Sequence, residues 1–281
     1  MIELVGVSYT YPDTEEPVLA GLDLSVGAGG VYGVVGASGA GKTTLAKTIS
    51  GFIPHAEGGD LEGSVTVADI AVADATLLDV VSKVGLVTQN PFNQITGARF
   101  SVGEEIAFGL ENLGVSRPDM IERVDAILER FGLQELRTRS PYELSGGQQQ
   151  LVAIASIMVM EPTILVMDEP TSQLDPGGTR LVFEVIDRVA AAGTTVVLFE
   201  HKLELLRDHA DTLGVLAEGR IVLAGSPRDV LADARLADWG VGSTRFTAAA
   251  RAAVAAGLEP ADAPLPVSLA EAVDYFGGGE R

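Results

Sequence analysis

Residues 36–44 read GASGAGKTT, and this glycine-rich segment constrains the fold more than any other part of the sequence. It lies between an apolar run, GVYGVV, and a helical pattern, TTLAKTIS, and fits the spacing G-x-x-x-x-G-K-[ST]. Glycines let successive backbone N–H groups surround an anion because no Cβ obstructs them, and the following helix presents its positive end to the same anion. The segment predicts a phosphate-binding loop between a buried strand and a helix. The alternative is a glycine-rich turn with a chance Lys-Thr pair.

The same segment predicts how a nucleotide and its metal ion are held. We expect Lys42 to bridge the β- and γ-phosphates and the Thr43 hydroxyl to bind Mg²⁺. The loop residues expected to contact the nucleotide are Gly36, Ser38, Gly39, Ala40, Gly41, Lys42, Thr43 and Thr44.

Two adjacent carboxylates end another apolar run, ILVMDEP at residues 164–170. An acid at the end of a buried strand is costly without a cationic partner, so Asp168 is expected to meet the Mg²⁺. Glu169 points elsewhere because successive strand side chains alternate, and we expect it to polarise an attacking water as a general base. A pair of solvated acids is the alternative.

Apolar and helical segments alternate along the chain. Residues 163–170 and 194–201 have the pattern of buried strands, with a helical pattern at 177–193 between them. Such alternation indicates an α/β fold with a mostly parallel sheet covered on both faces. We expect a core from about residues 1–90 and 163–228, a helical subdomain at about 91–162, and a small helical appendage at 229–281 that ends in a frayed FGGGER.

Composition narrows the possible partners. The net charge of −20 argues against nucleic acid, whose phosphates attract Lys and Arg. The chain has no cysteine, so disulfides and thiolate metal sites are absent. The longest nearly unbroken apolar run, residues 151–160, is too short to span a bilayer, and the acidic, alternating N-terminus is unlike a signal peptide. We expect a cytoplasmic protein.

Two further motifs carry a family resemblance. LSGGQ at 144–148, followed by ILVMDEPTSQLD at 164–175, resembles the ATP-binding-cassette (ABC) ATPases, and the likeness covers roughly residues 1–228. It implies a P-loop NTPase core with a helical subdomain and a small antiparallel β subdomain. It also implies that two ATPase domains pack head to tail with ATP between them. Residues expected near the partner's ATP are Ser145, Gly146 and Gly147 at the γ-phosphate and Gln148 at the ribose or phosphate.

The resemblance assigns four more positions. Tyr11 matches the aromatic residue that stacks on adenine, although a tyrosine on a strand surface is the alternative. Gln89 matches the glutamine that contacts Mg²⁺ and the attacking water. His201 matches the switch histidine at the γ-phosphate, and Asp175 matches the loop that crosses to the partner. His55 and His209 lack such context, and we expect structural or surface roles.

Two positions depart from the family pattern. Leu151 stands where many relatives carry an arginine, and Gln173 stands where a small residue is usual. The lost charge at 151 is expected to weaken pairing between the helix and the nucleotide or between domains. Neither change removes a primary catalytic group.

Three stretches resemble the energy-coupling-factor subgroup, which powers uptake of vitamins and of nickel or cobalt ions. They are GFIPHAEGGDLEGSV at 51–65, TQNPFNQITGARFSVGEEIAFGLENLGV at 88–115 and FEHKLELL at 199–206. The resemblance implies a second ABC ATPase chain, an integral membrane coupling subunit and a substrate-binding membrane subunit as partners, at the cytoplasmic face of the membrane. The alternatives are an exporter subunit, an ABC ATPase acting on DNA or the ribosome, and a small-molecule P-loop kinase.

Overall fold

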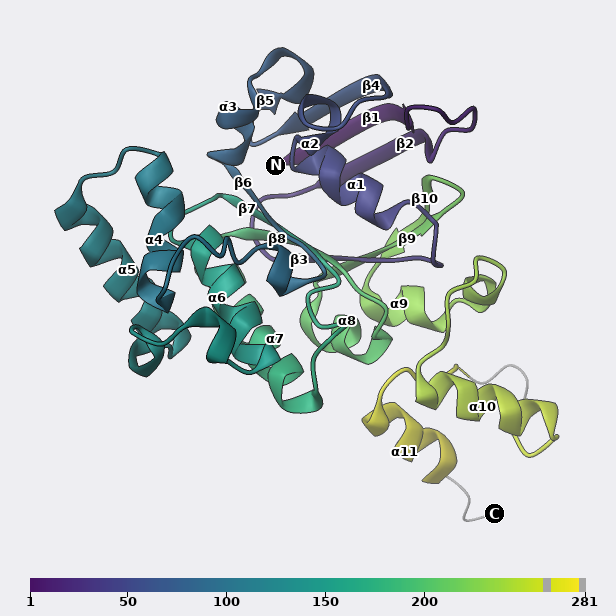
Figure 1. Ribbon diagram of the computed structural model, residues 1–281. Coiled ribbons are helices and arrows are strands. Elements are labelled where there is room, and N and C mark those ends of the chain that lie inside the picture. Colours follow the sequence, from purple (N-terminus) through teal and green to yellow (C-terminus); the bar gives the residue numbers. More distant parts are fainter. Residues whose placement is uncertain (260–263, 278–281) are drawn as a thin grey trace.

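A six-stranded sheet forms the centre of the computed structural model, which describes residues 1–259 and 264–277 (Figure 1). Its strands are β3 (Val31–Val35), β6 (Val84–Val87), β7 (Ile164–Asp168), β8 (Thr195–Phe199), β9 (Thr212–Ala217) and β10 (Arg220–Gly225). The strand order is β10-β9-β3-β8-β7-β6, and neighbours are parallel except β10, which runs antiparallel to β9. Every residue of β3, β7 and β8 is buried, which accounts for their continuous apolar sequences.

A second, antiparallel sheet covers one face of this core. It comprises β1 (Ile2–Thr10), β2 (Leu19–Val26), β4 (Asp60–Val67) and β5 (Ile70–Ala71) in the order β2-β1-β4-β5. Helix α1 (Lys42–Ile49) lies between the two sheets (Figure 1), and its buried Leu45 and Ile49 join one apolar cluster with residues of both. The short helices α2 (Phe52–His55) and α3 (Leu77–Val81) lie beside this sheet. This packing holds the start of α1 near the carboxyl end of β3, in the middle of the central sheet.

The other face of the central sheet is covered by α6 (Gly146–Met158), α7 (Pro176–Ala191), α8 (Leu203–His209) and α9 (Pro227–Ala232). Two further helices, α4 (Val102–Asn112) and α5 (Arg117–Phe131), pack on α6. Side-chain caps set their beginnings: Ser101 and Ser145 form capping boxes, and Ser116 caps α5 with Pro118 in its first turn. Helices α4 and α5 lie at one end of the molecule, and α6 connects them to the sheet (Figure 1).

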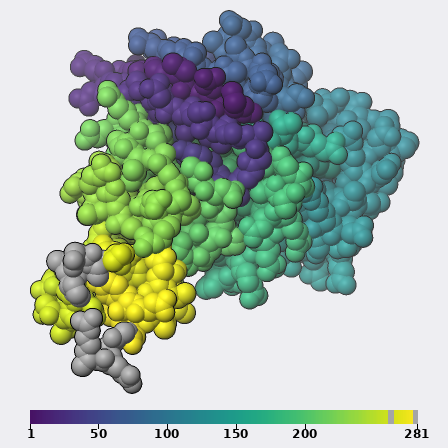
Figure 2. Space-filling view, turned by 180° about the vertical axis from the view of Figure 1, so that it is seen from behind, coloured from purple at the N-terminus to yellow at the C-terminus, as the bar shows by residue number. Residues whose placement is uncertain are grey.

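Two more helices, α10 (Arg245–Ala255) and α11 (Leu269–Gly277), form an appendage that projects from the body of the molecule (Figure 2). Polar contacts tie it to α8 and α9: Arg207 donates to the carbonyl of Val267 at 2.8 Å, and Arg228 pairs with Glu271 at 3.1 Å. Residues 278–281, the greater part of the segment expected to fray, lie outside the described residues.

The predicted fold class is confirmed: the chain is an α/β protein built on a mostly parallel sheet, with helices on one face and an antiparallel sheet and α1 on the other. Within residues 1–259 and 264–277, no helix combines the length and apolar character needed to cross a bilayer.

Candidate nucleotide site

The loop between β3 and α1 has the geometry of an anion cradle, and two of its glycines are required by the space around them. A Cβ on Gly36 would lie 2.4 Å from the backbone oxygen of Leu216. Gly41 has a φ of 101°, a conformation that L side chains rarely adopt. No side chain caps the N-terminus of α1, so its first N–H groups face the loop and can bind an anion.

Lys42 lies inside this cradle rather than in solvent. Its side chain is 6 % exposed, and its ammonium group donates to the carbonyls of Gly36 and Ala37, each at 3.0 Å. Burial lowers the pKa of Lys42, whereas the nearby Glu169 and Asp168 carboxylates act in the opposite direction. The ammonium group is therefore held where phosphates would meet it.

Glu169, the residue after β7, is the centre of a cluster of polar groups. Its carboxylate lies 2.6 Å from Nε2 of His201, accepts a hydrogen bond from Nε2 of Gln89 at 3.0 Å, and lies 3.9 Å from Nζ of Lys42. Glu169 has a φ of 49°, which is uncommon outside glycine and is often found at functional sites.

Asp168 ends β7 and is only 7 % exposed. Burial raises its pKa, while a hydrogen bond with Thr43 and the charge of Lys42 act in the opposite direction. Thr43, in the first turn of α1, and Asp168, at the end of β7, are therefore in contact.

One cavity of about 380 Å³ gathers most of the predicted residues. Its lining includes Ser38, Gly39, Gly41, Lys42, Thr43, Thr44, Gln89, Glu169 and His201. Tyr11 lies beside it, because its hydroxyl is 3.0 Å from Oγ1 of Thr44 and its ring meets Tyr9 edge-on. Residues more than 150 positions apart in the chain therefore share one site.

The N-terminus of α6 does not belong to that cavity. None of residues 145–148 lines it, and Ser145 and Gln148 are joined in a capping box, with Ser145 N–H donating to Oε1 of Gln148 at 3.1 Å. Ser145 and Gly146 are exposed, whereas Gly147 is buried and a Cβ on it would lie 2.8 Å from Cα of Gly178. Close packing of α6 on α7 thus requires glycine at 147, a reason that the sequence did not reveal.

The structure also brings forward groups that sequence reasoning missed. Glu200, one residue before His201, is 2 % exposed and accepts a hydrogen bond from Thr171. A charged residue at the end of a buried strand was the signal that could have found it, as it found Asp168. A second cavity, of about 300 Å³, lies between the phosphate loop, His201 and residues 240–243 of the appendage.

Four other residues considered in the sequence analysis lie outside the cavity at Glu169. Leu151 is 4 % exposed and packs in the larger apolar cluster, and Gln173 is exposed. Nε2 of His55 lies 2.8 Å from the carbonyl oxygen of Val72, and Nδ1 of His209 lies 2.9 Å from Asp187. Both histidines therefore have partners within the fold, outside the cavity at Glu169.

A phosphate loop at a helix N-terminus, a buried aspartate at the end of another strand of the same parallel sheet and a glutamate beside it define a P-loop nucleotide-hydrolysing site. The chain belongs to the ABC transporter family, whose model, described as "ABC transporter", matches residues 19–172. It is an ATP-binding subunit of that family and an ATPase.

Named relatives place the chain within this family. A putative ABC transporter ATP-binding protein of Pyrococcus horikoshii is 41 % identical over 231 residues, covering 82 % of this chain and 81 % of that protein. The energy-coupling factor transporter ATP-binding protein EcfA1 of Lacticaseibacillus paracasei is 38 % identical over 231 residues, covering 82 % of this chain and 80 % of that protein.

Two solved structures share the fold. One is cbiO1 from Clostridium perfringens, described as part of the ABC transporter complex cbiONQ; it is 28 % identical, with a TM-score of 0.74 over 83 % of this chain and 90 % of that one. The other is a dimeric ATP-binding cassette in a post-hydrolysis state bound to ADP and Pi, 26 % identical, with a TM-score of 0.69 over 81 % of this chain and 99 % of that one.

Proposed function

We propose that the chain is the ATP-hydrolysing subunit of an energy-coupling-factor type uptake transporter, of the vitamin or nickel/cobalt class, and that two such domains close around two ATP molecules. The observation that carries the catalytic part is the cluster around Glu169. In this proposal Glu169 polarises the attacking water and Gln89 helps to orient it. Lys42 and His201 stabilise the charge that develops on the transferred phosphoryl group.

The residues around Asp168 fit Mg²⁺. Carboxylate, hydroxyl and amide oxygens are the ligands that Mg²⁺ takes, and Asp168, Thr43 and Gln89 offer one of each. Asp168 is a buried carboxylate that forms no ion pair among the described residues, and a buried charge without a partner is costly. When bound, Mg²⁺ would neutralise phosphate charge.

The second chain would supply the N-terminus of α6. Ser145 and Gly146 are exposed on a surface separate from the Glu169 cavity, so within one chain this helix end has no nucleotide. No acidic residue lies in its first turn, so its positive end suits the γ-phosphate held by a partner. The dimeric cassette bound to ADP and Pi among the similar structures supports this arrangement.

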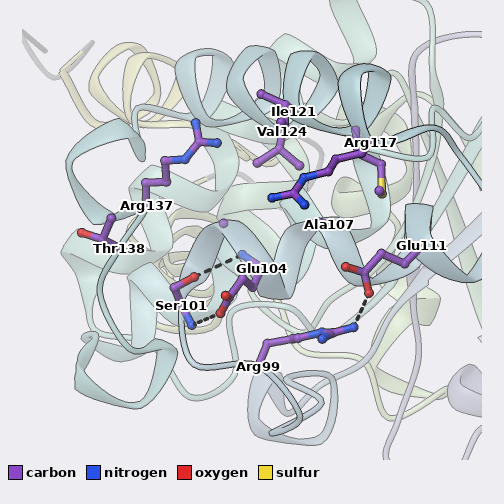
Figure 3. Close-up of a pocket in the computed structure, with 12 residues that line it drawn as sticks. Arg99, Ser101, Glu104, Ala107, Glu111, Arg117, Ile121, Val124, Arg137 and Thr138 are labelled. Atoms are coloured by element: carbon purple, nitrogen blue, oxygen red, sulfur yellow. Dashed lines mark hydrogen bonds and ion pairs between the residues drawn. The ribbon is translucent and has the colours of Figure 1, made fainter.

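We place the docking surface for the membrane subunit on the α4–α5 side. A cavity of about 490 Å³ lies there, with Ala107, Met120, Ile121 and Val124 as apolar lining and Arg99, Arg117, Arg137, Glu104 and Glu111 as charged lining. Figure 3 shows Arg99, which precedes α4, paired with Glu111 near the end of that helix, and Arg117 and Arg137 lying around the same helix. The occupant we propose is a cytoplasmic helix of the coupling subunit. Its apolar face would contact the apolar lining residues, and its polar ends would contact the charged lining residues.

The segment that joins this surface to the catalytic cavity is tightly held. Gln94 donates to the carbonyl of Leu86 at 2.8 Å and accepts from Thr88 N–H at 3.2 Å. Glu105, 2 % exposed, accepts from the N–H of Thr96 at 2.7 Å. Phe92 and Phe100 remain 52 % and 88 % exposed, as expected of aromatic residues that a partner covers. Movement at Gln89 would therefore reach this surface.

The test is co-purification from membranes in mild detergent. We expect the tagged chain to retain a second ATPase, a membrane coupling protein and a small substrate-binding membrane protein, and Phe100→Asp to lose the membrane proteins while retaining ATP hydrolysis. Leu78→Asp, at an exposed apolar position outside this surface, is the matched control. Recovery of a membrane subunit without a substrate-binding protein would favour an exporter, and recovery of no membrane protein would favour a non-transport ABC ATPase.

A further inference from the structure

A buried network connects the turn that carries His201 to the loop that follows Glu169. Glu200 accepts hydrogen bonds from the N–H of His201 at 3.0 Å and of Lys202 at 3.4 Å, and from the hydroxyl of Thr171. Lys202 Nζ donates to the carbonyl and hydroxyl oxygens of Thr171, at 2.8 and 3.1 Å, and to the hydroxyl of Thr179 at 3.3 Å. Thr171 is therefore the point at which both side chains meet.

The hydroxyl group of Thr171 both donates and accepts a hydrogen bond in this network. The Thr171 hydroxyl accepts from the ammonium group of Lys202 and donates to the carboxylate of Glu200, so it lies between opposite charges. Thr171 is fully buried and Glu200 is 2 % exposed. Charge-assisted hydrogen bonds are stronger than neutral ones, and a group left without its partner in such a site is costly. The hydrogen bonds of Thr171 with Glu200 and Lys202 therefore favour a single conformation of these three side chains.

The position of this network relative to the catalytic cluster gives it a role. Thr171 lies two residues after Glu169, and Glu200 and Lys202 flank His201, so both catalytic side chains sit on the two segments that the network joins. The backbone hydrogen bonds that pair the two segments end with the bond from Glu169 N–H to the carbonyl of Phe199, at 2.9 Å. Beyond that bond, Thr171, Glu200 and Lys202 provide the connection.

We propose that Thr171, Glu200 and Lys202 are positioning residues for ATP hydrolysis: together they clasp the His201 turn to the loop of residues 170–175. The inference rests on the proposed roles of Glu169 and His201. Because residues 172–175 lead into α7 and are the proposed crossing to the partner chain, the clasp also carries the position of that loop to His201. Hydrolysis is then fast only while the loop is seated.

The test compares Thr171→Val, which keeps the shape and removes the hydroxyl, with Thr171→Ser, which keeps the hydroxyl. We expect kcat per folded protein to fall about 10- to 100-fold in Thr171→Val, as misplacement of a catalytic group does, and to stay within about threefold of wild type in Thr171→Ser. Affinity of the monomer for ATP should change less than about twofold in both, because Thr171 lines neither the cavity at Glu169 nor the cavity at residues 240–243.

A double-mutant cycle provides a second readout. Lys202→Met should lower kcat by itself, and Thr171→Val combined with Lys202→Met should lose little more than the larger single effect, because both disrupt one unit. Glu184→Gln, at a position 47 % exposed on α7, is the matched control, and its effect should add to that of Thr171→Val. Lys202→Met decides the question if Thr171→Val does not fold, since Lys202 is partly exposed.

The variant His201→Ala shows whether a negative result contradicts the proposed clasp or the proposed role of His201. If His201→Ala lowers kcat but Thr171→Val and Lys202→Met leave it at the wild-type value, the clasp is wrong and the role of His201 stands. If ATP affinity falls as much as kcat in Thr171→Val, the network is merely structural and the proposal is overturned. An unchanged kcat in His201→Ala would overturn the proposed role of His201 itself, and the clasp with it.

Discussion

Oε1 of Glu169 lies 2.6 Å from Nε2 of His201, although 31 residues separate them in the chain. The contact arises because β7 and β8 are adjacent and parallel, with Asp168 opposite Phe199. Carboxyl ends of parallel strands lie along one edge of a sheet, where α/β proteins bind their ligands. Glu169, one residue after β7, and His201, two residues after β8, therefore reach the same cavity.

Replacement of Glu169 by glutamine should stop turnover without preventing nucleotide binding. The amide keeps the size of the side chain but cannot take a proton from water, so we expect kcat to fall at least 100-fold, within the range attributed to general bases. With ATP, the variant should accumulate as a dimer, measured by light scattering after gel filtration. Glu129→Gln, on the exposed side of α5, is the control, and hydrolysis by Glu169→Gln at the wild-type rate would refute the assignment.

Replacement of Ser145 by arginine should separate ATP binding from hydrolysis. The added side chain occupies the exposed N-terminus of α6, where we propose that the partner's γ-phosphate docks, so kcat should become undetectable. Binding of one ATP per monomer, measured by calorimetry, should be retained. Ser145→Ala removes only the cap, which costs about 1 kcal/mol, and should hydrolyse ATP at a reduced rate. Loss of binding by the Ser145→Arg monomer would place Ser145 in its own chain's nucleotide site.

Replacement of Asp168 by asparagine should stabilise the ligand-free protein at pH 7 while abolishing Mg²⁺-dependent hydrolysis. Burial raises the pKa of Asp168 in the folded state, so the folded protein binds this proton more tightly than the unfolded chain. Stability contributed by the group therefore falls as pH rises through the folded pKa, and at pH 7 the cost of the buried charge is fully present.

The measurement is the unfolding temperature of both proteins as a function of pH. We expect Tm of Asp168→Asn to exceed that of wild type at pH 7 by a few degrees, since about 1 kcal/mol corresponds to roughly 2–4 °C in a chain of this size. The difference should shrink as pH falls through the folded pKa of Asp168. A variant less stable than wild type at pH 7 without Mg²⁺ would show that Asp168 has a favourable partner within the fold.

Replacement of Gly240 by valine should weaken ATP binding, although Gly240 lies outside residues 19–172, which the family model matches. Gly240 has a φ of +67°, and a Cβ there would lie 3.1 Å from the Cβ of Ala37 in the phosphate loop. A β-branched residue is strained in this conformation and would press on the loop, so we expect a 3- to 10-fold loss of affinity, using about 1 kcal/mol of transmitted strain.

Gly242→Val is the matched control for this change, because a Cβ at Gly242 meets open space. Its ATP affinity, measured by the same titration, should equal that of wild type. Equal losses in both variants would mean that the contact between residues 240–243 and the phosphate loop has no specific effect on nucleotide binding.

Several features of the fold and site were predictable because they depend on neighbouring residues. A cradle for phosphate needs glycines and a helix start within one short segment, so residues 36–44 predicted their own conformation, as the φ of Gly41 shows. The continuous apolar runs predicted the buried strands β7 and β8.

The sequence by itself determined the phosphate loop, the strand-end acids and the α/β alternation, since each is encoded over a few adjacent positions. The tertiary structure produces the convergence of Gln89, Glu169 and His201, which only the family resemblance had implied. It alone decided that Gly147 packs against Gly178 and that residues 240–243 reach the phosphate loop. The physical reason is the strand order, in which β3 lies between β9 and β8, and β7 between β8 and β6. Contacts between side chains far apart in the chain follow from that order and register, and no local pattern records them.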